Sequence, residues 1–233
     1  MIDIGIVKDI WGGFDFSYLL DILLSVIPSL FCITFHELSH GYVAYLLGDD
    51  TAKRAGRLTL NPLKHIDPMG LLMMVMFRFG WAKPVPVNMY RFKDPKKGMA
   101  ITALAGPVSN LLLAVVFMVL YGALYLPLRK SAVGGYVLQM LVLGGYISTG
   151  LAVFNLIPIP PLDGSKVLLA VLSDEAYSKL MRYERYGILL MVVLVASGIL
   201  GRPLSAAVSA VYQHVLAPIA VSVSRLVYQL FYR

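Results

Sequence analysis

Long apolar runs, separated by short polar segments, dominate the hydrophobic pattern of this chain. Such runs cover about residues 16–47, 98–126, 135–157, 186–200 and 204–231. Roughly twenty apolar residues are enough to cross a bilayer as a helix. The pattern therefore predicts about five transmembrane helices. The run at 186–200 is short, and the last run, which contains Pro218, can either span with a kink or lie in the interface.

The segment between the first two runs has a different pattern. Residues 51–67 are polar and basic, and residues 68–79 are apolar but too few to span, which suggests a re-entrant or interfacial segment. Residues 80–88 then read Gly-Trp-Ala-Lys-Pro-Val-Pro-Val-Asn. Their prolines disfavour a helix and predict an extended backbone. We expect a short re-entrant and extended segment associated with the membrane.

The composition agrees with a membrane protein. Of 233 residues, 58% are hydrophobic and 14% are charged, against a globular average of about 25% charged. The fold class expected is an all-α polytopic protein in a lipid bilayer. Cys32 is the single cysteine, which excludes an internal disulfide and a cysteine-based zinc site. No basic stripe with interleaved aromatics accompanies the net charge of +7, so no nucleic-acid partner is expected.

Basic residues predict the orientation. With five spans and the N-terminus outside, sixteen of the twenty Lys and Arg residues fall on the inner side, ten of them between Lys53 and Lys97. Cytoplasmic loops of membrane proteins carry such an excess. This orientation places the ends of the first and third helices on the same, cytoplasmic side.

The first candidate functional residues lie in the first apolar run, where His36–His40 reads His-Glu-Leu-Ser-His. Residues four apart lie on one helical face, so His36 and His40 can bind one metal ion. Glu37 can act as the general base toward a water activated by that metal. His-Glu-x-x-His on a helix is the signature of zinc proteases. An unpaired polar set in an apolar helix would be costly, which favours a functional site.

A catalytic zinc needs a third protein ligand and an open position. The other two histidines are His65, in the basic loop, and His214, in the last apolar run. Asp163 is the stronger candidate, because it lies in a Pro-rich turn on the predicted correct side. Asn155 precedes this turn and could bind the substrate backbone or a developing oxyanion, or equally cap the helix. Asn110 has the same ambiguity.

Two other functions use the same residues. A transporter of metal ions or protons could use the buried groups as a relay or as transport ligands. A catalytically inactive module could capture membrane helices without cutting them, although the intact Glu37 argues against it. A Glu37→Gln change separates a protease from a transporter, because it removes the general base and spares the metal ligands.

Three segments in this order resemble the site-2 protease family of intramembrane zinc metalloproteases: His36–His40, Ala105–Asn110 and Asn155–Gly164. The resemblance covers the family's three-helix catalytic core at about residues 16–170. Two further segments, Gly56–Leu63 and Gly80–Asn88, resemble the small prokaryotic branch, which has no PDZ or CBS domains.

The resemblance implies a role for each matching residue. His36, His40 and Asp163 would bind one Zn²⁺ per chain. Glu37 would be the general base, and Asn155 would assist substrate or oxyanion binding.

The resemblance also implies a substrate class and a location. Family substrates are transmembrane segments of other membrane proteins, cut near the cytoplasmic face in regulated intramembrane proteolysis. We expect a multi-pass protein of a bacterial or archaeal cell membrane. Residues 1–170 would form the protease core, and residues 171–233 would add C-terminal helices.

Overall fold

The computed structural model describes residues 16–77, 81–182 and 184–232, and within these ranges the chain is predominantly helical. The helices are α2 Phe16–Leu46, α3 Thr51–Arg54, η1 Pro62–Lys64, α4 Pro68–Phe77, η2 Met89–Arg91, α5 Pro95–Leu128, α6 Ala132–Asn155, α7 Asp163–Val167, η3 Leu168–Ala170, α8 Asp174–Arg182, α9 Glu184–Ala196, α10 Gly201–Val211, η4 Tyr212–Leu216 and α11 Ala217–Phe231. β-pairing in the described ranges is an isolated antiparallel bridge between Ile66 and Ala82. The all-α prediction is confirmed.

Four helical segments in the described ranges are long and apolar enough to cross a bilayer: Ile22–Leu46, Pro95–Leu128, Ala132–Asn155 and Gly201–Phe231. The last of these joins α10, η4 and α11. The span expected at 186–200 is corrected. It corresponds to α9, which has 13 residues and is about 20 Å long at 1.5 Å per residue, against a hydrocarbon core of about 30 Å. Helix α9 ends at Ala196, and Gly198 follows in a left-handed conformation with a φ of 72°, which helix ends favour.

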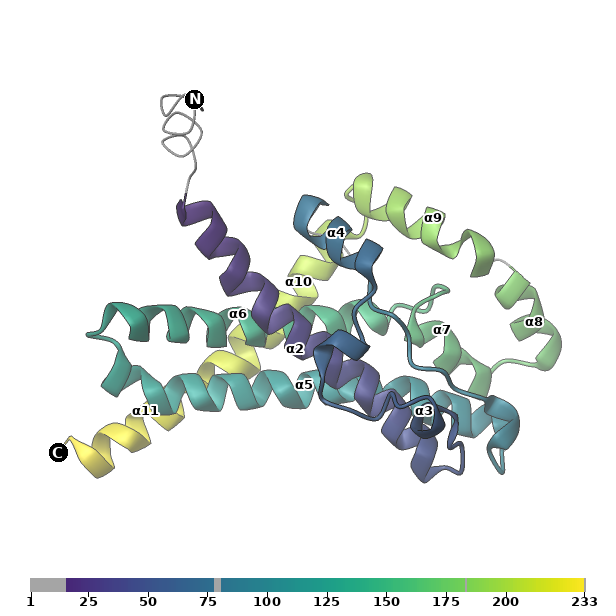
Figure 1. Ribbon diagram of the computed structural model, residues 1–233, viewed down its shortest axis with the longest axis horizontal. Coiled ribbons are helices and arrows are strands. Elements are labelled where there is room, and N and C mark those ends of the chain that lie inside the picture. The colour runs from purple at the N-terminus through teal and green to yellow at the C-terminus, as the bar shows by residue number, and fades with distance from the viewer. Residues whose placement is uncertain (1–15, 78–80, 183, 233) are drawn as a thin grey trace, which may run out of the picture.

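Small residues let the membrane helices approach one another closely. Helices α5 and α6 run antiparallel through a short turn, and α2 crosses both (Figure 1). A side chain at Gly144 would lie 2.8 Å from the ring of Phe117, and one at Gly122 would lie 2.9 Å from Cβ of Val223. Such contacts are typical of membrane helix interfaces. In this arrangement, the C-terminal end of α2 and the junction of α6 with α7 lie at the same end of the bundle (Figure 1).

The segment after α2 returns toward that helix. It passes through α3, η1 and the ten-residue α4, which at about 15 Å is too short to span. Residues Trp81–Asn88 then lie extended, as their prolines predict, whereas Gly80 lies outside the described residues. We call Ala82–Asn88 the strap. The carbonyl oxygen of His65 accepts a hydrogen bond from the N–H of Lys83, which joins the strap to the loop around η1.

Candidate metal centre

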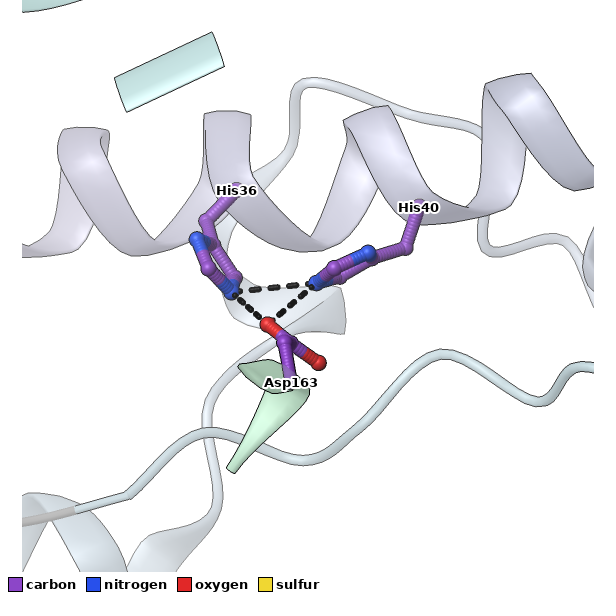
Figure 2. A group of neighbouring side chains, drawn as sticks. All are labelled: His36, His40 and Asp163. Carbon is purple, nitrogen blue, oxygen red and sulfur yellow. Dashed lines mark hydrogen bonds and ion pairs between the residues drawn. The ribbon is translucent and has the colours of Figure 1, made fainter. Parts of the chain in front are cut away.

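Helix α2 presents His36 and His40 on one face, as their spacing predicts. Their ring centroids lie 4.6 Å apart, and the two Nε2 atoms are separated by 3.0 Å. Both residues are buried, although they lie within a segment that is long and apolar enough to span the membrane. The two imidazoles therefore converge on one point in the helical bundle (Figure 2).

Asp163 reaches the same point from the other side. The Pro-rich turn after α6 ends at Leu162, and Asp163 begins α7. Its Oδ2 lies 3.0 Å from Nε2 of His36 and 3.0 Å from Nε2 of His40 (Figure 2). The three residues form a buried group that could hold a metal ion. The structure thus brings together the three residues chosen from the sequence as candidate ligands.

This donor set fits a zinc ion. Three tetrahedral ligands with ordinary Zn–N and Zn–O bonds lie about 3.3 Å apart, close to the 3.0 Å spacing observed. Nδ1 of His40 donates a hydrogen bond to the carbonyl oxygen of Thr102 at 2.7 Å. A carbonyl can only accept, so Nδ1 carries a proton, and Nε2 is the nitrogen that faces the centre and can bind a metal.

Helix α5 closes one side of the centre through a glycine. A Cβ atom at Gly106 would lie 2.6 Å from Cε1 of both His36 and His40, and closer still to Nε2 of His40. These distances are shorter than van der Waals contact, so a larger residue would push into the space between the imidazoles. The glycine of the Ala105–Asn110 segment is therefore required by the close approach of α5 to the candidate ligands.

A cavity of about 280 Å³ opens beside the candidate ligands, between α2, the strap, α5, α6 and α7. Glu37, Asn155 and Lys166 contribute to its wall. Oε2 of Glu37 accepts a hydrogen bond from the N–H of Val85 in the strap at 2.8 Å. Nδ2 of Asn155 donates to the carbonyl oxygen of Leu151 at 3.0 Å. Both candidate catalytic side chains thus line the same space as the candidate ligands.

Charges around Asp163 keep its carboxylate ionised. Burial by itself raises the pKa of Asp163, but the contacts with His36 and His40 outweigh that effect and hold the pKa well below its ordinary value. Its second oxygen, Oδ1, lies 3.5 Å from Nζ of Lys166 one turn later on α7. An ionised carboxylate is the form that binds a metal.

Sequence reasoning missed three contributors to this centre. Lys166 follows Asp163 by three residues, a helical spacing that could have indicated the contact. Thr102 acts through its main-chain carbonyl, which every residue carries, and Val85 through its N–H, which every residue other than proline carries. No pattern of side chains could have singled them out.

The remaining polar candidates lie elsewhere. Asn110 is buried where α5 meets α6, and its carbonyl oxygen accepts a hydrogen bond from Ser148. Nε2 of His65 lies 2.9 Å from the carbonyl oxygen of Thr59, and Nδ1 of the exposed His214 lies 2.9 Å from that of Ala210. Among the described residues, neither histidine belongs to the metal-binding group.

Comparison with known proteins identifies the family. The chain is 41% identical over 175 residues to YwhC of Bacillus subtilis, which is named as a candidate zinc metalloprotease, and this covers 72% of the chain and 78% of YwhC. The family described as peptidase family M50 matches residues 122–200. The chain belongs to peptidase family M50, the site-2 proteases. It is therefore a zinc metalloendopeptidase with membrane-spanning helices, as the resemblance of its motifs implied.

Other M50 relatives come from bacteria and archaea. Rip2 of Mycolicibacterium smegmatis is 32% identical over 190 residues, which cover 80% of this chain and 71% of Rip2. MJ0611 of Methanocaldococcus jannaschii is 34% identical over 161 residues, which cover 67% of this chain and 76% of MJ0611. Both are also named as candidate zinc metalloproteases. No solved structure matches the chain.

Proposed function

We propose that this M50 peptidase cleaves transmembrane segments of other membrane proteins inside the bilayer. The carrying observation is the burial of His36, His40 and Asp163 beside a 280 Å³ cavity that Glu37 also lines. Both histidines belong to a segment long and apolar enough to span. A peptide that reaches these groups must therefore enter the membrane region, which suits a transmembrane substrate better than a soluble one.

In this proposal, His36, His40 and Asp163 hold the zinc ion. When bound, zinc acts as a Lewis acid that polarises the scissile carbonyl and lowers the pKa of a water. Glu37 takes the proton from that water and returns it to the leaving amine. Asn155 lines the same cavity, and its amide can turn from Leu151 to hydrogen-bond the substrate backbone or the developing oxyanion.

The substrate must unwind before it can be cut. The carbonyl groups of a transmembrane helix are occupied by hydrogen bonds within that helix. The strap lies extended along the cavity, and its backbone can pair with an unwound substrate strand by edge addition. Deletion of the strap without loss of cleavage would argue against this pairing.

The active site is proposed to face the cytoplasm. With four spans and the N-terminus outside, fifteen of the twenty Lys and Arg residues lie on the inner side, from Lys53 to Lys97 and from Lys166 to Arg202. The correction from five spans to four thus preserves the basic excess that marks cytoplasmic segments. The division into a core at 1–170 and C-terminal helices at 171–233 stays part of the same proposal.

The decisive experiment compares the wild type with Glu37→Gln in liposomes. A panel of transmembrane-segment reporters tests cleavage, and zinc is measured on the same samples. We expect one zinc per chain in both proteins and cleavage by the wild type alone, because the amide cannot accept the proton. Absence of zinc from both proteins, or undiminished cutting by Glu37→Gln, would refute the assignment. Zinc transport into the liposomes without cleavage would favour the transporter.

A further inference from the structure

Two buried charged residues hold the ends of the strap. Arg57 is 7% exposed, and its guanidinium donates hydrogen bonds to the carbonyl oxygens of Lys83 at 2.6 Å and Pro84 at 3.3 Å. At the other end, Oδ2 of the fully buried Asp49 accepts the N–H of Asn88 at 2.6 Å. Both charges come from the segment just after α2, and both bind main-chain groups of the strap.

Between these two ends the strap meets Glu37. The N–H of Val85 donates to Oε2 of Glu37 at 2.8 Å. Pro84 and Pro86 flank Val85 and have no N–H, so the Val85 amide is the one donor that the Pro-Val-Pro sequence can offer. Val85 is buried, and it packs so closely on α2 that a side chain at Gly41 would lie 3.0 Å from its Cγ1.

The burial of these charges needs an explanation. A buried ion is costly unless hydrogen bonds compensate for lost solvation. Asp49 obtains further bonds from the N–H and hydroxyl of Thr51, and Arg91 lies 4.0 Å away. The hydrogen bonds of the Arg57 guanidinium go to strap carbonyls, and Nε of Arg57 is buried without a hydrogen-bond partner in the described ranges. Neither Arg57 nor Asp49 lines the cavity, so their contacts serve the strap.

We propose that Arg57 and Asp49 are positioning residues for the general base. They fix the strap so that the Val85 N–H holds one oxygen of the Glu37 carboxylate, and the other oxygen is left for proton transfer. The inference rests on the proposed role of Glu37 as general base. It assigns to two residues outside the cavity a part in the chemical step through a chain of main-chain hydrogen bonds.

The kinetic test uses the full chain in liposomes with zinc measured on each sample. Arg57→Met removes both bonds to the strap, whereas Arg57→Lys keeps a cation that can reach one carbonyl. We expect Arg57→Met to lower kcat by about 10- to 100-fold, the scale of a small misplacement of a catalytic group. Zinc content should change little, kcat should fall whether or not KM rises through weaker pairing of the strap with substrate, and Arg57→Lys should recover part of the rate.

A matched control lies three residues away. The Arg54 side chain is 68% exposed and pairs with Asp50 on its own helical turn. Arg54→Met removes the same charge without touching the strap, so its kcat should equal that of the wild type. Oδ1 of Asp49 accepts from Thr51 and Oδ2 accepts from Asn88, so Asp49→Asn, which keeps a single acceptor oxygen, cannot satisfy both. This change should therefore loosen the opposite end of the strap and lower kcat as Arg57→Met does.

Hydrogen exchange tests the clamp without any substrate. In the wild type, the amides of Val85 and Asn88 should exchange slowly, because Glu37 and Asp49 accept their hydrogen bonds. Arg57→Met should speed exchange at Val85, and Glu37→Gln, which keeps an acceptor oxygen, should not. This readout stands even if no reporter is cut, so failure of the proposed function and failure of the clamp can be told apart.

Two results would overturn the inference. The first is an Arg57→Met protein with full zinc, a protected Val85 amide and wild-type kcat. The second is a raised KM at unchanged kcat, which would mean that the strap only pairs with substrate and does not orient Glu37. Should Arg57→Met fail to fold, Arg57→Lys and Asp49→Asn decide the question, and wild-type kcat with wild-type exchange in both refutes the clamp.

Discussion

At the scale of single residues, the centre depends on a few contacts that admit little change. His40 is oriented through its Nδ1 by the carbonyl oxygen of Thr102. Gly106 leaves room for the imidazoles, and Lys166 faces the second oxygen of Asp163. Such surrounding groups set ligand geometry almost as strongly as the ligands themselves.

Gly106 gives the sharpest test at this scale. Gly106→Ala should reduce bound zinc to well below one per chain, because the added methyl group would overlap the imidazole of His40. The helix itself should tolerate the change, since alanine favours helix by about 1 kcal/mol over glycine. Zinc content of the purified protein, measured by mass spectrometry, checks the prediction. Gly150→Ala on α6 is the matched control, because a Cβ there meets no atom within 4 Å. Full zinc in both variants would contradict the prediction for Gly106.

At the scale of elements, the strap is a segment without repeating secondary structure that gains its order from neighbours. Its prolines remove donors, and Arg57, Glu37 and Asp49 bind main-chain groups of Lys83, Val85 and Asn88. The strap should loosen when one of the charged residues that bind it loses its charge. Asp49 is such a residue, and it lies outside the membrane-spanning segments.

Acid should weaken the strap through Asp49. Burial by itself raises the pKa of this carboxyl, but hydrogen bonds from Thr51 and the Asn88 N–H, with the charge of Arg91, lower it below its ordinary 3.8. A lowered native pKa stabilises the fold above the unfolded value, and the contribution is lost as pH falls through the native pKa. The wild type should therefore unfold at a higher temperature than Asp49→Asn above pH 3.8, and the difference should shrink below it.

Thermal unfolding of both proteins between pH 3 and pH 7 measures this difference. The neighbouring pair of Asp50 with Arg54 and Arg91 is present in both proteins, so its own titration cancels in the comparison. A difference that grows toward low pH would show that the sign is wrong.

At the scale of the whole molecule, the topology depends on whether α9 crosses the membrane. Its 13 residues and the left-handed Gly198 favour a helix that does not span, and the continuous helix from Gly201 to Phe231 then makes the fourth crossing. The residues before and after α9 should lie on the same side of the membrane.

Cysteine labelling tests this arrangement. The native Cys32 is fully buried and should not react, so any labelling reports on the single introduced cysteine. Ser173→Cys and Ser197→Cys place exposed thiols before α8 and after α9. A membrane-impermeant maleimide should label both from the cytoplasmic side in oriented vesicles. Labelling of the two from opposite sides would restore the five-span arrangement.

Much of the architecture was predictable because it follows from local pattern. Apolar run length predicted α2, α5 and α6 close to their observed bounds. The four-residue spacing of His36 and His40 predicted their shared face. The run at 186–200 was wrongly predicted to span, because mean hydropathy does not reveal that the helix stops just before Gly198.

The sequence by itself determined most of the membrane helices, the His-Glu-x-x-His motif and the family, because each depends on side-chain types and their spacing. Tertiary structure alone decided that Asp163 lies 3.0 Å from both histidines, and that Val85 and Thr102 contact Glu37 and His40 through the main chain. The physical reason is that backbone N–H and C=O groups are nearly the same in every residue. Which of them reaches a candidate catalytic or metal-binding side chain depends on how distant segments pack.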